Sequence, residues 1–318
     1  QDADGRWDAA TERYENGKPA RGDDDFTAHC PPEEICAGEC AYWEADPALT
    51  GLALLTYLGA GYTHVQGRYA ETVGKGLHFL IEQQKPDGDL RGRSQAVGMY
   101  CHAMATLALC ELWGQTGDDE LKPVVAKAVD LLVRCQNSQG GWRYEPAPTG
   151  ADISVTIMTV MALRSGKNAG LHVPDETFKK AISYIKSCYR PTQGGFTYQP
   201  GSGQPGFART AAGCCVLFLT GEYTAKEIPD AVDYLKRHFE SPMHFYYGQY
   251  YAVHAMYQVG GKDWEDWYAR VSDWFLPKQG SDGSWSQTSR REVGPVYQTS
   301  IAVIALSTPD HYLPIFQR

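Results

Sequence analysis

The sequence has little that suits a polyanionic partner or a lipid bilayer. Of its 318 residues, 29 are Lys or Arg and 38 are Asp or Glu, which gives a formal net charge of −9. Such a chain lacks the basic surface with which proteins bind nucleic acid. It also lacks any apolar run near the roughly 18 to 20 residues of a membrane-spanning helix. We therefore expect neither a nucleic acid partner nor a transmembrane span.

Cysteine is also sparse, with nine residues in the chain. An odd and dilute set does not suit a disulfide scaffold in a chain long enough to bury its own core. His29, Cys30, Cys36 and Cys40 stand close together in sequence, but their spacing matches no common zinc pattern. A zinc knuckle, a disulfide and free thiols remain alternatives for this segment. We expect no cofactor and no bound metal.

A degenerate QxxxGxW repeat runs along the chain. In such a turn glycine permits tight backbone geometry, the aromatic ring packs between neighbouring helices, and glutamine can bond loose helix-end groups. The motif is therefore interpreted as structural. Its copies are QDADGRW at 1–7, QKPDGDL at 84–90, QNSQGGW at 136–142, RPTQGGF at 190–196 and QGSDGSW at 279–285.

Two kinds of helix alternate around these copies. Amphipathic stretches precede the motif, for example at 70–83, 121–136 and 176–188, and predict outer helices with one solvated face. More uniformly apolar stretches follow it and predict buried inner helices. These lie at 47–59, 98–114, 152–166, 208–221, 248–261 and 296–307.

Six inner helices alternating with outer ones predict an all-α fold, an (α/α)6 toroid that forms a single domain over residues 1–318. The first outer helix is expected to be missing, because the chain opens on Gln1, the residue with which that helix would end and the first motif begins. A larger parent protein upstream of Gln1 is therefore expected. An irregular, Cys-containing insertion is predicted at about 21–45, and the motif is absent from the fifth turn.

Repeated QxxxGxW turns before inner helices that end in an Ala-Leu pair and Gly resemble the squalene and hopene cyclases and, more loosely, the protein prenyltransferases. The resemblance covers nearly the whole chain. Segments such as GGWRYEP and FYYGQYYAVHAMYQVGG look most like single-toroid prenyltransferase and squalene-oxidase-repeat proteins of planctomycete bacteria. A bacterial, extracytoplasmic protein is the expectation that follows.

The family's known chemistry does not carry over. The four positions of the proton-donating DxDD run fall on Asp152, Ile153, Ser154 and Val155, so one acid remains. The three zinc ligands of a prenyltransferase fall on Asp152, Ser154 and Gln298, so two are missing. The thioester run CGEQ has only CAGEC at 36–40 as a counterpart, without the glutamine. We expect neither a DxDD cyclase nor a zinc prenyltransferase.

Aligning the inner helices on their closing Leu residues predicts which side chains face the cavity. The positions equivalent to Asp152 are Pro47, Gly98, Ala208, Phe245 and Pro295, so this ring holds one acid. The candidate ligand-binding residues are Tyr100, Asp152, Tyr247, Tyr297 and Gln298, and the candidate catalytic residues are His102, Asp152 and Arg209. Asp152 could instead cap its helix, and His102 and His254 could be core histidines.

These residues support three functional hypotheses. The first is a binding module that holds an elongated apolar or isoprenoid-like ligand in the central cavity, against tyrosine faces and a few hydrogen-bonding groups. The second is an enzyme, a lyase or hydrolase acting on a glycan or peptide through cavity Asp, His, Tyr and Arg side chains. The third is a structural interaction module. Two facing carboxylates would favour the hydrolase.

Overall fold

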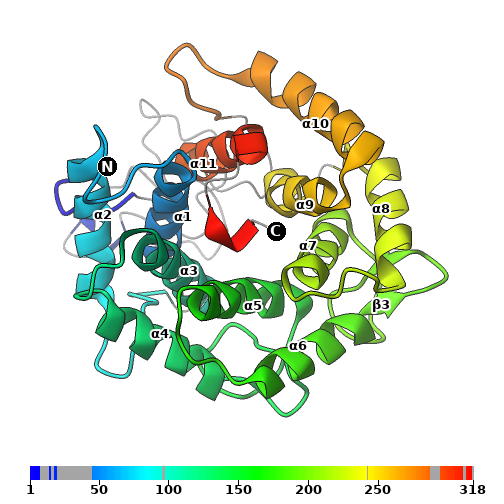
Figure 1. Cartoon of the computed structure of the whole chain (residues 1–318), viewed down its shortest axis with the longest axis horizontal. Helices are drawn as coiled ribbons and strands as arrows, with labels where there is room; N and C mark the ends of the chain where they lie inside the picture. The colour runs from blue at the N-terminus through cyan, green and yellow to red at the C-terminus, as the bar shows by residue number, and fades with distance from the viewer. Residues whose placement is uncertain are drawn as a thin grey trace.

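The computed structural model describes residues 1–7, 14–15, 18–19, 45–94, 97–241, 243–286, 294–310 and 313–316. In these ranges eleven α-helices form two concentric rings (Figure 1). The inner ring consists of α1 (Asp46–Gly59), α3 (Gly98–Thr116), α5 (Ile153–Asn168), α7 (Phe207–Leu219), α9 (Phe245–Val259) and α11 (Gly294–Ser307). The outer ring consists of α2 (Ala70–Gln83), α4 (Lys122–Arg134), α6 (Asp175–Ser187), α8 (Glu227–Arg237) and α10 (Gly261–Phe275). The predicted all-α toroid is confirmed.

Outer helices form because their apolar residues fall on one side. In α4 the buried residues are Val125, Ala128, Val129, Leu131 and Leu132, a stripe with the three-to-four-residue spacing of a helix. Charged residues occupy the other face and remain in water.

Inner helices are buried on nearly every side, as their uniform apolar character predicts. α3 is buried from Met99 to Trp113 with the one exception of Tyr100. Neighbouring inner helices pack directly on one another, and α11 packs on α1, so the ring closes on itself. Among the described residues, no helix is both long and apolar enough to cross a bilayer.

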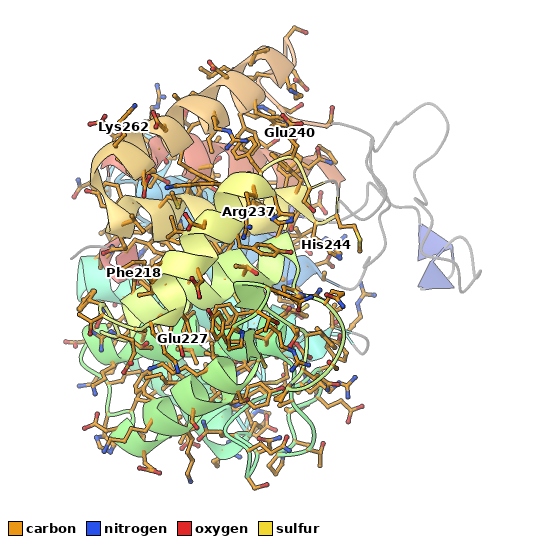
Figure 2. The ribbon with its side chains drawn as sticks, turned by 90° about the vertical axis from the view of Figure 1, so that its right-hand side faces the viewer. Phe218, Glu227, Arg237, Glu240, His244 and Lys262 are labelled. Atoms are coloured by element: carbon orange, nitrogen blue, oxygen red, sulfur yellow. The ribbon has the colours of Figure 1, made fainter. Side chains whose placement is uncertain are left out.

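All inner helices run in the same direction, so the ring has two distinct ends. Figure 2 shows this from the side: His244, directly before α9, and Phe218, near the end of α7, lie at opposite edges. We call them the N-terminal end and the C-terminal end of the ring. Side chains from the first turns of several inner helices therefore meet at the N-terminal end.

The QxxxGxW turn joins three elements. The amides of Gln1 and Gln136 donate to carbonyls of both the turn and the next outer helix, as Gln136 Nε2 does to Gly140 (2.9 Å) and Thr177 (2.9 Å). Gln84 keeps the bond to the outer helix and Gln279 the bond to the turn. At four copies the backbone N–H of the aromatic residue donates to a threonine hydroxyl of the following inner helix. The pairs are Trp7 with Thr50, Trp142 with Thr156, Phe196 with Thr210 and Trp285 with Thr299, at 3.0 to 3.1 Å.

Removing that hydroxyl is expected to destabilise the ring. Thr156 is fully buried, so in Thr156→Val the N–H of Trp142 loses its acceptor in a dry site. We expect the free energy of unfolding to fall by about 1 to 3 kcal/mol, measured by urea denaturation. In Thr156→Ser, which keeps the hydroxyl, the free energy of unfolding is expected to fall by clearly less. An unchanged unfolding free energy in Thr156→Val would mean that the hydrogen bond contributes nothing.

Short strands and 3-10 turns complete the described structure. β1 (Tyr14–Glu15) pairs with β2 (Lys18–Pro19), and β3 (Tyr189–Arg190) pairs with β4 (Gly195–Phe196), each antiparallel. The second pair is a hairpin formed by the RPTQGGF copy. The 3-10 turns are η1 (Leu276–Lys278), η2 (Thr308–Asp310) and η3 (Pro314–Phe316). His29, Cys30, Cys36 and Cys40 lie outside the described residues.

Candidate functional site

Asp152 lies at the N-terminal end of the ring, where it caps α5. Its backbone is extended, its N–H donates to Trp142 O (3.0 Å), and its Oδ1 accepts from Val155 N (3.0 Å). The capping role weighed from the sequence is therefore confirmed. The side chain is fully buried, yet its Oδ2 has no partner with hydrogen-bond geometry among the described residues. Oδ2 of Asp152 is thus the carboxyl oxygen that could bond a ligand.

Three tyrosines, Tyr100, Tyr198 and Tyr247, lie close enough to this carboxyl group to interact with its charge, and two more contact them. We define the tyrosine cluster as Tyr100 of α3, Tyr144 and Tyr198 of the loops before α5 and α7, and Tyr247 and Tyr251 of α9. The hydroxyls of Tyr144 and Tyr198 hydrogen-bond to each other, and the Tyr251 hydroxyl donates to that of Tyr247 (3.4 Å). The rings of Tyr100 and Tyr144 lie 6.2 Å apart. All but Tyr251 are partly exposed, so a ligand at this end could reach them.

Burial keeps the cluster neutral. It raises the pKa of Tyr100 well above the ordinary value and that of Tyr247 to about 12, and the negative charge of Asp152 acts in the same direction. The pKa of Asp152 is raised as well, because burial outweighs the hydrogen bond from Val155 N and the favourable interaction with the nearby Tyr198 hydroxyl. The tyrosines are therefore hydroxyl donors near neutral pH, and Asp152 binds a proton more readily than an exposed aspartate.

Ser154 and Arg143 complete the surroundings of Asp152. The Ser154 hydroxyl interacts with those of Tyr100 and Tyr247 and lowers the pKa of both. Arg143 is exposed, its guanidinium lies 5.6 Å from the centre of the Tyr144 ring, and its charge lowers the pKa of Asp152. The site thus combines aromatic faces, neutral hydroxyls, one carboxyl group and one cation at its edge.

His102 has a structural position in the repeat. It occupies the place of the repeat threonine: its Nδ1 accepts from Leu90 N (3.1 Å), and its Nε2 donates to Ala128 O (3.1 Å). It is fully buried, and burial lowers its pKa to about 4. Both ring nitrogens are occupied by backbone groups, so the geometry favours the core histidine over the catalytic one. His254 also lies in the interior, stacked on Phe316.

The structure does not bring Arg209 to the cluster by any described contact. Its Nη2 donates to Gln204 O (3.1 Å), and its charge lowers the pKa of Tyr234 on the outer helix α8. Tyr297 is half-buried and Gln298 fully buried on α11, and their ligand-binding role stays a prediction. Tyr100, Tyr247 and Asp152 are the predicted residues that meet.

Tyr144 and Tyr198 were missed, although the repeat contains the signal. Each lies two residues after the aromatic of its motif copy, Trp142 and Phe196. The loop after each turn leads back to the next inner helix, so the same position in two copies reaches the same end of the ring. Tyr251 lies one helical turn after Tyr247 and shares its face.

The threonine bonds also correct the register in two inner helices. Thr50 and Thr210 are the partners of the motif aromatics, so they align with Thr156. Four residues earlier, the counterparts of Asp152 are then Asp46 and Gly206, instead of Pro47 and Ala208. Asp46 is a second acid in this ring of positions, but it is buried between Arg6 (3.7 Å) and Arg93 (3.9 Å).

The chain is similar to proteins of two kinds. Residues 45–207, just over half of the chain, match the sequence profile described as the squalene-hopene cyclase C-terminal domain. Among solved structures, a cellobiose 2-epimerase from Spirochaeta thermophila DSM 6192 superposes with a TM-score of 0.62 at 14% identity, over 82% of this chain and 85% of its own. An α-1,6-mannanase from Salegentibacter sp. HEL1_6, solved in complex with α-1,6-mannotetrose, superposes with a TM-score of 0.59 at 9% identity, over 85% of this chain and 89% of its own. These likenesses concern the fold. No curated protein sequence matches.

Proposed function

This chain belongs to the squalene-hopene cyclase C-terminal domain family, and on that fold we propose that it binds a carbohydrate at the N-terminal end of the ring, with Asp152 as a proton donor to the bound sugar. The observation that carries the proposal is the unpartnered Oδ2 of a buried carboxyl group facing a cluster of tyrosine hydroxyls. Tyrosine rings offer apolar faces for the C–H side of a sugar, and their hydroxyls bond its oxygens.

The free oxygen of Asp152 favours a sugar over an isoprenoid. An apolar chain against this site would leave the buried Oδ2 without a hydrogen-bond partner, at a cost of about 1 to 3 kcal/mol. A sugar hydroxyl, or the water that accompanies it, would satisfy this oxygen. The two solved structures named above, a cellobiose 2-epimerase and an α-1,6-mannanase, are enzymes that act on sugars, which supports the same choice.

The residues limit which chemistry accompanies binding. Glycoside hydrolysis uses two carboxyl groups about 5 to 9.5 Å apart, whereas Asp152 is the single carboxyl in the site as defined. A tyrosine base is disfavoured as well, because burial raises the pKa of Tyr100, Tyr198 and Tyr247. A single protonated carboxyl group is suited to donate a hydrogen bond or a proton to a sugar oxygen.

The proposal is tested with cellobiose and an α-1,6-linked mannose tetramer as probes, by calorimetry and by chromatographic analysis of products. We expect saturable binding of at least one sugar, about five-fold weaker in Tyr100→Phe and in Tyr247→Phe, because each loses one hydrogen bond of about 1 kcal/mol. Farnesol serves as the isoprenoid probe. Binding of farnesol without either sugar would overturn the proposal in favour of the apolar ligand.

Asp152→Asn separates binding from proton transfer. Asparagine is an equally good helix cap, and its amide keeps one donor and one acceptor, so we expect sugar affinity to stay within about three-fold. It cannot deliver a proton, so any conversion of the sugar by the wild type should be lost. Full conversion by Asp152→Asn would exclude Asp152 as the proton donor.

A further inference from the structure

The last described residues lie inside the ring. Figure 1 places η3 and the C-terminus within the circle of inner helices, and η3 contacts α3 and α5. Ile315 and Phe316 are each 2% exposed. A chain end that packs this deeply closes the ring at its C-terminal end, so a ligand enters at the opposite end.

Three inner helices hold this segment. Ile315 N donates to Glu111 Oε2 of α3 (3.3 Å), and Ser165 of α5 donates to the other oxygen of the same carboxyl group. From α9, Gln258 Nε2 donates to Phe316 O (2.9 Å). The Phe316 ring stacks on His254 of α9, with ring centres 3.4 Å apart and planes 8° from parallel. This is a set of specific bonds made from both sides of the ring.

A continuous row of rings leads from this segment to the candidate site. Phe316 meets Tyr250 with ring centres 6.4 Å apart, Tyr250 meets Tyr251 at 5.0 Å, and Tyr251 meets Tyr247 at 5.0 Å. Tyr250 and Tyr251 are at most 2% exposed, so they have no room to move independently. Phe316 is therefore linked through ring contacts to the two cluster tyrosines of α9.

We propose that the C-terminal segment Leu313–Phe316 is a positioning element of the candidate site, which closes the ring and, through Phe316, fixes Tyr247 and Tyr251 of α9 against Asp152. The contact of these tyrosines with a ligand rests on the proposed function. The ordering of the tyrosines by the segment is independent of it. A cavity of about 20 Å³ beside Phe316 and His254 is large enough for one water molecule, so the fit on this side is tight.

The test is hydrogen exchange of the full chain, followed by mass spectrometry in peptides that cover α9 and, for comparison, α4. In Phe316→Ala we expect at least ten-fold faster exchange in α9 and little change in α4. Phe316→Tyr keeps the stacked ring and is expected to restore slow exchange. Phe79→Ala is the matched control, because Phe79 of α2 is also buried, at 6% exposed, but lies outside the row of rings. A truncation that removes residues 313–318 provides a second variant.

Unchanged α9 exchange in both Phe316→Ala and the truncation would overturn the proposal. So would an equal acceleration in α4 and α9, because that pattern reports a loss of global stability only. Affinity for the sugar probes supplies an independent readout: loosened α9 with unchanged affinity would also contradict positioning. If the wild type binds no sugar, the proposed function fails, while the exchange result still decides the role of the segment.

Discussion

Gly140→Ala is expected to lower the free energy of unfolding by about 2 to 5 kcal/mol. Gly140 is the glycine of the third QxxxGxW turn and has φ of +94°, a conformation that costs an L-residue about 1 to 2 kcal/mol. A Cβ at this position would also lie 2.3 Å from the carbonyl oxygen of Lys180. Neither backbone segment can yield without loosening the bond from Gln136 to the same outer helix, so overpacking adds about 1 to 3 kcal/mol.

Gly283→Ala is the matched control within the same motif. Gly283 has φ of +86°, but a Cβ there would meet nothing closer than the Gln279 amide at 3.9 Å. The unfolding free energy of this variant should fall only by the cost of the backbone conformation, about 1 to 2 kcal/mol. Urea denaturation of both variants at one pH measures the difference. Equal losses would show that the contact with the next outer helix contributes nothing.

The stability of the wild type is expected to fall by about 3 kcal/mol as the pH rises from below 4.5 to above 7, through Glu111 alone. Burial raises the pKa of this carboxyl group from 4.5 to about 7, against the hydrogen bonds from Ser165 and Ile315 N. Below pH 4.5 it is protonated in both states. Between the two values only the unfolded state releases the proton, so unfolding becomes more favourable as the pH rises.

Glu111→Gln removes this titration and keeps the shape. A glutamine oxygen can accept from Ile315 N, and its amide can donate to Ser165, so both contacts survive. The unfolding free energy of the variant minus that of the wild type, measured by urea denaturation, should rise by about 3 kcal/mol from pH 4 to pH 8. Taking the difference cancels other titrations, including that of Asp152. A difference independent of pH would contradict a buried, proton-binding Glu111.

The fold could be predicted from the sequence because each copy of the repeat carries the same pattern. Helix period, buried or amphipathic character, and the glycine-aromatic turn all agree, and errors in one copy are corrected by the others. The register of individual inner helices was predicted less accurately. Counting back from the closing Leu pair misplaced Thr210 by two residues, because the loops and helices differ in length between repeats. The bond from Phe196 N to Thr210 gives the correct alignment.

The site was only half predictable, for a geometric reason. Tyr100, Asp152 and Tyr247 lie in the first turns of inner helices, where helical register determines direction. Tyr198 approaches the same carboxyl group from a loop, and Tyr144 contacts Tyr198 from another loop. The path of each loop depends on tertiary contacts that no local pattern encodes. His102 was ambiguous because a buried imidazole looks the same in sequence whether it binds substrate or, as here, the N–H of Leu90.

Contact between α1 and α11 closes the ring, and it joins the first of the described α-helices to the last. On a ribosome that adds roughly 5 to 20 residues per second, the roughly 250 residues from the start of α1 to the start of α11 take about 12 to 50 s to appear. For that time the apolar flank of α1 lacks its final neighbour, and the inner helices already made form an open arc. Closure of the ring therefore waits until α11 has been synthesised.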